Sequence, residues 1–115
     1  MQMHTQLLIR RQPAASHICI EGSVDASNAR AVAQAIPQDV RALADGDGTI
    51  HLDFEGLELD DGHAVVEVVN ALRTILEESA VVIHHAPQML AHTLYKTGML
   101  RGTRLSLEEP RVEEP

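Results

Sequence analysis

The chain has 115 residues, the usual size of one domain, and its 17 acidic residues outnumber its 9 basic residues to give a formal net charge of −8. It has no basic stripe to neutralise phosphates, which argues against binding to nucleic acid or to an anionic membrane surface. With one Phe, one Tyr and no Trp, the core must be built from aliphatic side chains, as in a sheet covered by helices.

The first predicted elements are two strands. Residues 6–11 and 16–21 are short apolar segments on either side of a polar connection that contains Pro13, and this arrangement predicts a strand pair of the hairpin type. Gly22 follows the second segment directly, and we expect it to end that strand.

A helix is predicted next, since apolar residues recur at helical spacing between residues 29 and 36. Pro37 lacks an N–H and disfavours helical backbone at the residue before it. We therefore expect a kink or break there, with residues 38–44 forming a second helical piece. Three residues offer short side-chain acceptors that could cap the start of the helix: Asp25, Ser27 and Asn28.

The central segment is a strand, a turn and a helix. Residues 50–54 form an apolar run typical of a buried strand, and the helix expected over residues 62–78 carries its apolar side chains on one face. In the turn between them, Asp61 can accept hydrogen bonds from the first N–H groups of the helix. Asp60 adds a favourable charge near the positive end of the helix dipole.

Residues 80–84 predict a further buried strand, residues 87–97 a third helix ended by Gly98, and residues 103–107 an edge strand. Four side chains of the third helix are expected to point inward: Met89, Leu90, Leu94 and Tyr95. Residues 1–108 are thus predicted to form a single α/β domain, with a mixed sheet of four to five strands and helices packed mainly on one side. Residues 109–115 are expected to be a disordered acidic tail.

The seven histidines raise the question of a metal site or an enzyme. His84 and His85 are adjacent, so on a strand their rings should face opposite sides, and His92 on the next helix could approach one of them. No carboxylate or cysteine completes a recognisable ligand set around these three. No nucleophile with a base can be assembled either. We therefore expect no enzyme activity, no metal and no cofactor, and an enzyme using His84, His85 or His92 with a metal is the least favoured alternative.

Cys19 is the only cysteine, so no disulfide can form within the chain, and it is interpreted as a small buried apolar residue. The N-terminus has no hydrophobic signal core, and no apolar run approaches the length of about 18 residues that a membrane span needs. The prediction is a cytoplasmic protein without direct membrane insertion.

Four short motifs occur in an order and spacing that resemble STAS domains, the family of anti-sigma-factor antagonists and of the cytoplasmic tails of sulfate transporters. The resemblance extends from about residue 6 to residue 107. Its motifs are Gly22-Ser23-Val24-Asp25, Leu52-Asp53-Phe54-Glu55-Gly56-Leu57-Glu58-Leu59, Pro87-Gln88-Met89-Leu90 and Thr97-Gly98-Met99-Leu100. It implies a STAS-like sheet and a non-catalytic role in bacterial signal transduction and transcription regulation.

The chain departs from this family at the phosphorylation switch. Antagonists of this type carry Asp-Ser-Ser-Gly, whereas this turn has Asp61, Gly62, His63 and Ala64. Because Gly62 and His63 replace both serines, no phosphorylation is expected here. The acidic turn could instead mimic the phosphorylated state, and His63 could titrate near neutral pH.

The resemblance implies a protein partner, either an anti-sigma factor with serine kinase activity or the ATPase subunit of a transporter. In the second case the chain would be a STAS accessory subunit of a lipid-transport ABC system. Homodimerisation stays open. The predicted partner-binding residues are Asp60, Asp61, Gly62, His63, Glu67, Asn70, Ser23 and Asp25.

Overall fold

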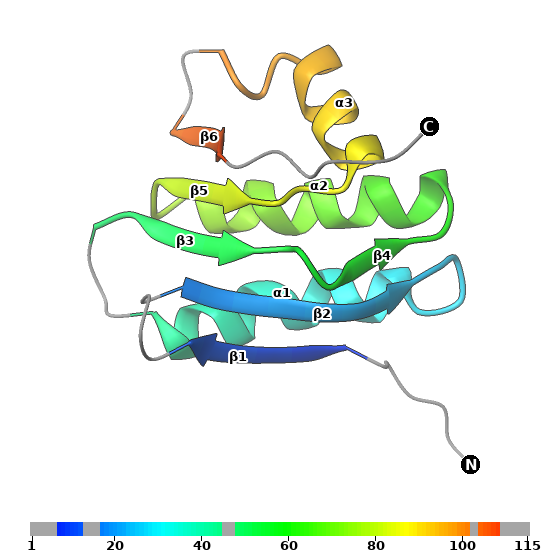
Figure 1. Ribbon diagram of the computed structural model, residues 1–115, viewed down its shortest axis with the longest axis horizontal. Coiled ribbons are helices and arrows are strands. Elements are labelled where there is room, and N and C mark those ends of the chain that lie inside the picture. The colour runs from blue at the N-terminus through cyan, green and yellow to red at the C-terminus, as the bar shows by residue number, and fades with distance from the viewer. Residues whose placement is uncertain (1–6, 13–16, 45–47, 102–103, 109–115) are drawn as a thin grey trace.

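The computed structural model describes residues 7–12, 17–44, 48–101 and 104–108, and these ranges contain six strands and three helices (Figure 1). In chain order the elements are β1 (Leu8–Gln12), β2 (His17–Val24), α1 (Ala29–Leu43), β3 (Ile50–Asp53), β4 (Leu57–Leu59), α2 (Gly62–Leu76), β5 (Val81–His84), α3 (Gln88–Lys96) and β6 (Leu105–Glu108).

The strands form one mixed sheet in the order β1-β2-β3-β5-β6, and β4 pairs with β2 off this path. β1 runs antiparallel to β2, as the predicted hairpin requires, and every other pair is parallel. The predicted α/β class with a mixed sheet is confirmed. β4 is additional to the strands expected from the sequence.

β3 and β4 form one strand path along β2, interrupted by a bulge. Between two paired positions, Cys19 with Asp53 and Gly22 with Leu57, β3–β4 contains one residue more than β2. The Leu57 N–H donates to the Phe54 carbonyl across 2.9 Å and closes the turn. Gly22 has a φ of 133° and donates its N–H to the Gly56 carbonyl at 3.0 Å. The glycine thus accommodates the bulge, and the expectation that it ends β2 was wrong, because β2 continues to Val24.

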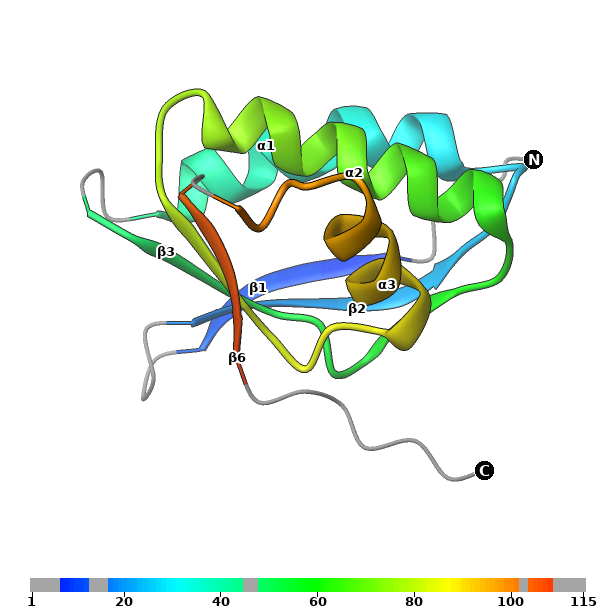
Figure 2. The same ribbon diagram turned by 90° about the horizontal axis from the view of Figure 1, so that it is seen from above.

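α1 and α2 lie side by side against one face of the sheet (Figure 2). Their apolar faces and the facing side chains of β2, β3 and β5 make the core, which includes the fully buried Phe54. α1 runs without a break through Pro37, so the predicted second helical piece does not exist. Pro37 is buried beside the likewise buried Ile36 and Val40, and this packing offsets part of the local cost of the proline.

α3 packs beside α2 and presents a narrow apolar strip. Leu90 and Leu94 are buried as predicted, but Met89 and Tyr95 are 47% and 72% exposed, so their predicted inward orientation was wrong. Nine residues give too few turns to bury more than one line of side chains. Gly98 follows the helix with a φ of 79°, as expected of a terminating glycine.

β6 lies at the edge of the sheet, next to β5, as predicted. The connection over residues 13–16, part of the turn at residues 45–47 and the predicted tail at residues 109–115 lie outside the described residues. Within the described part of the chain, no helix has both the length and the apolar character that crossing a membrane would require.

Candidate functional site

Two loops meet at the edge of the sheet where β2 and β4 end. Because these strands are parallel, their carboxyl ends point the same way, and the Asp60 N–H donates to the Val24 carbonyl at 2.8 Å. This bond places the turn before α2 beside the loop before α1. We call the surface formed by residues 25–28 and 60–63 the acidic edge.

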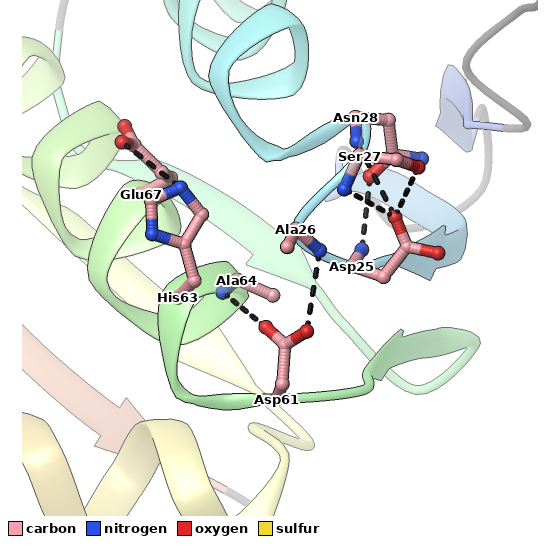
Figure 3. A network of polar contacts seen from close by, with 8 residues as sticks. All are labelled: Asp25, Ala26, Ser27, Asn28, Asp61, His63, Ala64 and Glu67. Carbon is pink, nitrogen blue, oxygen red and sulfur yellow. Dashed lines mark hydrogen bonds and ion pairs between the residues drawn. The ribbon is translucent and has the colours of Figure 1, made fainter.

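Asp61 joins the two loops through its carboxylate (Figure 3). Its Oδ1 accepts a hydrogen bond from the Ala64 N–H at 2.9 Å, which is the predicted cap of α2. Its Oδ2 accepts from the Ala26 N–H at 3.2 Å, 35 residues away in sequence. Both oxygens therefore bind backbone N–H groups, and Asp61 positions the acidic edge.

Asp25 organises the neighbouring loop. Its Oδ1 accepts from the Ser27 N–H at 2.8 Å, the Ser27 hydroxyl at 2.6 Å and the Asn28 N–H at 3.3 Å. The bond from the Ser27 hydroxyl is the main cause of a pKa of Asp25 below its ordinary value, and the backbone N–H groups of Ser27 and Asn28 add to it. In turn, the Asn28 side chain accepts from the Asp25 N–H at 2.9 Å and donates to the Ser23 carbonyl at 3.0 Å. Ser23 is thereby tied to the same loop.

Asn28 precedes the first residue of α1 but makes no side-chain capping bond to it. Of the three caps suggested by the sequence, Asp25 and Asn28 instead stabilise the loop, with Ser27 as a donor to Asp25. The polar residues before α1 thus fix the shape of the acidic edge.

The first turns of α2 continue the surface. Gly62, His63 and Asn70 are exposed, whereas the Glu67 side chain is only 20% exposed. His63 Nε2 and Glu67 Oε2 are 3.9 Å apart, at the outer limit of an ion pair, which makes their attraction weak. Val66 on the same side of the helix is 52% exposed and was not among the predicted residues. An apolar side chain therefore lies among polar ones next to the acidic edge.

The eight predicted residues lie at the end of β2, in the two loops of the acidic edge and along α2. Residues 60–63 contain no hydroxyl group. The neighbouring loop carries a hydroxyl group, that of Ser27, which donates to Asp25. Ser27 is far from residues 60–63 in sequence, so the sequence alone did not place it in the same surface. Asp61 is engaged with the backbone, so the exposed Asp60 is the carboxylate that faces solvent from the turn.

A second group of residues, which we call the histidine cluster, was missed in the sequence. His17 on β2, His51 on β3 and His84 on β5 lie together, with ring centroids 5.2 Å (His17–His51), 4.3 Å (His17–His84) and 5.2 Å (His51–His84) apart. His51 Nδ1 and His84 Nε2 are 2.9 Å apart, the distance of a hydrogen bond. These three histidines come from strands that are far apart in sequence, and the pairing of the strands in the sheet aligns them.

His85 also departs from expectation. Its φ of 60° ends the alternation of β5, and its Nδ1 lies 3.2 Å from Asp53 Oδ1. Asp53 pairs in register with His84, so their side chains share one face of the sheet. His85 therefore reaches toward the face of the sheet that carries His84, and the predicted opposite orientation was wrong.

Cys19 lies on this sheet face too and is buried, as predicted. Burial raises the pKa of its thiol, and the nearby charge of Asp53 raises it further. The thiol is thus held in its neutral form, which suits a packing role.

Comparison with known proteins gives no match to this chain, either among the models of protein families or among curated proteins.

Proposed function

We propose that this chain is a non-catalytic regulatory domain that binds a protein partner through the acidic edge and the exposed side of α2. The observation that carries the proposal is the Asp61 carboxylate, which joins the loops before α1 and α2 into one surface. The motifs of the sequence resemble STAS anti-sigma-factor antagonists, and an antiparallel first strand pair followed by parallel crossovers suits that resemblance.

The partner proposed is an anti-sigma factor with a kinase-type ATP-binding domain. Val66 supplies an exposed apolar contact, and His63 and Asn70 flank it with polar groups on the same helix. Interfaces combine an apolar centre with a polar rim in this way. Asp60 adds negative charge at one end, which would select a partner with a basic counterpart.

We expect that ATP does not dissociate the proposed complex, in contrast to a complex that is regulated by phosphorylation. In a phosphorylated antagonist, negative charge appears on a serine at the start of α2, whereas here that turn has only Gly62 and His63 beside the acids. The exposed Asp60 gives this turn a permanent charge. We propose that the chain is held in one binding state.

The test is affinity capture from a native lysate with three forms of the chain: wild type, Asn70→Arg and Tyr95→Arg. Both variants place an arginine at an exposed helical position, but Tyr95 lies on α3 and belongs neither to the acidic edge nor to α2. Wild type and Tyr95→Arg should retain a kinase-type anti-sigma factor that Asn70→Arg loses. Capture of the same proteins by all three forms would reject the surface, and capture of a transporter ATPase would favour the accessory-subunit role.

A second test addresses the missing switch. With the captured partner and radiolabelled ATP, we expect no label on the chain and no release of the complex. Transfer of phosphate to any of residues 60–63 would contradict the proposal of a permanent state.

A further inference from the structure

We propose that the histidine cluster binds one divalent transition-metal ion, with Zn²⁺ as the test ion. The proposal is independent of the partner-binding surface, because the cluster lies on the sheet face opposite α1 and α2. It concerns His17, His51 and His84. Each of these residues offers one ring nitrogen, and the three nitrogens all lie within 4.8 Å of one another.

The sheet brings these residues together with little freedom. Ile18 on β2 pairs with Leu52 on β3. His17 and His51 each lie one residue before this pair, so they have the same register position on neighbouring parallel strands. His84 is in register with Asp53, two residues beyond His51 and on the same face. Side chains on adjacent strands hold a metal site more precisely than side chains on loops.

The distances are close to those of a metal site. Tetrahedral Zn²⁺ with bonds of about 2.0–2.1 Å to imidazole keeps its ligand nitrogens about 3.3 Å apart. His51 Nδ1 and His84 Nε2 are 2.9 Å apart, so a small separation of these rings would admit the ion between them. The His17 ring is stacked on His84 at an interplanar angle of 24° and would have to turn to direct a nitrogen at the same point.

The chemistry of the cluster also suits such an ion. Imidazole nitrogen is a ligand that zinc, copper and nickel share, whereas calcium and magnesium prefer oxygen. Three histidines leave a fourth position open for water. His17 and His51 are half-exposed, so the cluster is accessible from solvent, and the net charge of −8 favours the approach of a cation.

A competing group of ligands lies alongside. Asp53, Glu55 and His85 also have ligand atoms within 4.8 Å of one another. Carboxylates at a half-exposed position are common without a metal, and Asp53 already accepts the Glu55 N–H at 2.9 Å. This second group is the matched alternative that the experiment has to separate from the histidine cluster.

The experiment measures Zn²⁺ binding by equilibrium dialysis with metal analysis, on the full chain after removal of metal with a chelator. We expect one Zn²⁺ per chain. His51→Gln should weaken binding at least ~100-fold, since loss of groups that only support a ligand already costs roughly 10–100-fold in affinity. His85→Gln, which alters the neighbouring group, and His92→Gln, which alters an exposed histidine on α3, should bind as wild type does.

Co²⁺ gives an independent readout, because tetrahedral Co²⁺ absorbs strongly in the visible region and should lose that absorption in His51→Gln. If His51→Gln fails to fold by circular dichroism, His17→Gln takes its place, since that ring is also half-exposed. Absence of stoichiometric Zn²⁺ on the wild-type chain overturns the proposal. Retention by the cluster variants with loss in His85→Gln overturns it as well and assigns the ion to the Asp53 group.

Discussion

The Asp61 carboxylate binds the N–H of Ala64 in its own helix and the N–H of Ala26 in another loop, at 2.9 and 3.2 Å. A capping residue usually serves one helix, but here the second oxygen fixes the position of a loop that follows a different strand. The same side chain therefore contributes to the stability of α2 and to the shape of the acidic edge.

Asp61→Ala should lower the free energy of unfolding by about 1–2 kcal/mol, because it removes the cap and the bond to Ala26 together. Asp61→Asn should cost less, since its amide oxygen can still cap α2. Urea unfolding of both variants measures the difference. Asp60→Ala, at the exposed neighbouring carboxylate, is the control and should stay within about 0.5 kcal/mol of wild type. A loss in Asp61→Ala no larger than the loss in Asp60→Ala would contradict the stabilising role of the two bonds.

Asp25 should make the stability of the chain depend on pH in the acidic range. Its folded pKa lies below the ordinary value of 3.8, chiefly because the Ser27 hydroxyl donates to it. A lowered folded pKa means that the stabilisation is fully present above the unfolded pKa and is lost as the pH falls through the folded pKa. Wild type should therefore be more stable than Asp25→Asn at pH 7, and the difference should shrink as the pH falls below 3.8.

The cause of this shift can be tested separately with Ser27→Ala. Removing the hydroxyl should raise the pKa of Asp25 toward its ordinary value, as measured by NMR titration of the carboxyl carbon. An unchanged pKa in Ser27→Ala would leave the backbone N–H groups as the only source of the effect.

Local pattern was enough to predict the elements whose apolar faces are regular. The helical period between residues 62 and 76 predicted α2, and Asp61 was predicted as its cap because a short acceptor precedes the apolar face. The orientation of α3 was only half correct, since period alone cannot tell how wide a strip a neighbouring helix covers. Met89 and Tyr95 fall outside that strip.

Features that depend on register between distant strands could not be predicted. β4 was not predicted, because the bulge at residues 54–56 interrupts the strand pattern of the sequence. The pairing with β2 resumes after the bulge, from Leu57 onward. The histidine cluster depends on β2, β3 and β5 being adjacent, and no spacing within any one strand announces it. The sequence offers one hint of the cluster, since a histidine directly precedes both Ile18 and Leu52. This hint has meaning only once the two strands are known to pair.

Pro37→Ala should increase the stability of the chain. α1 passes through Pro37, which cannot donate to the carbonyl one turn earlier, and an interior proline costs a helix about 3 kcal/mol relative to alanine. Part of that gain is offset by the lost burial of the ring and by a freer unfolded chain. We expect a net increase of about 1 kcal/mol in urea unfolding. Gln38→Ala, one exposed position later, should change the stability by less than about 0.5 kcal/mol. A loss of stability in Pro37→Ala would mean that ring packing dominates at this position.

Gly56→Ala and Gly62→Ala should have opposite effects, because only one of these glycines has a close neighbour. A Cβ at Gly56 would lie 2.8 Å from Glu21 Cγ and 3.2 Å from Glu21 Cβ, whereas a Cβ at Gly62 would meet no atom within 4 Å. Gly56→Ala should cost about 1 kcal/mol as the Glu21 side chain is displaced. Gly62→Ala, at the first residue of α2, should gain about 0.4–1 kcal/mol by restricting the unfolded chain.

The cause of the Gly56 effect can be isolated with Glu21→Ala, which removes the Cγ atom that the new methyl group would meet. Glu21 also pairs with Arg10 at 3.1 Å, but both side chains of that ion pair are partly exposed to solvent, so the pair should contribute little. In the Glu21→Ala background, Gly56→Ala should therefore lose most of its penalty, and a double-mutant cycle of urea unfolding free energies measures this coupling. If the penalty is the same in both backgrounds, the strain at Gly56 comes from the backbone of the bulge itself and the contact with Glu21 is not its source.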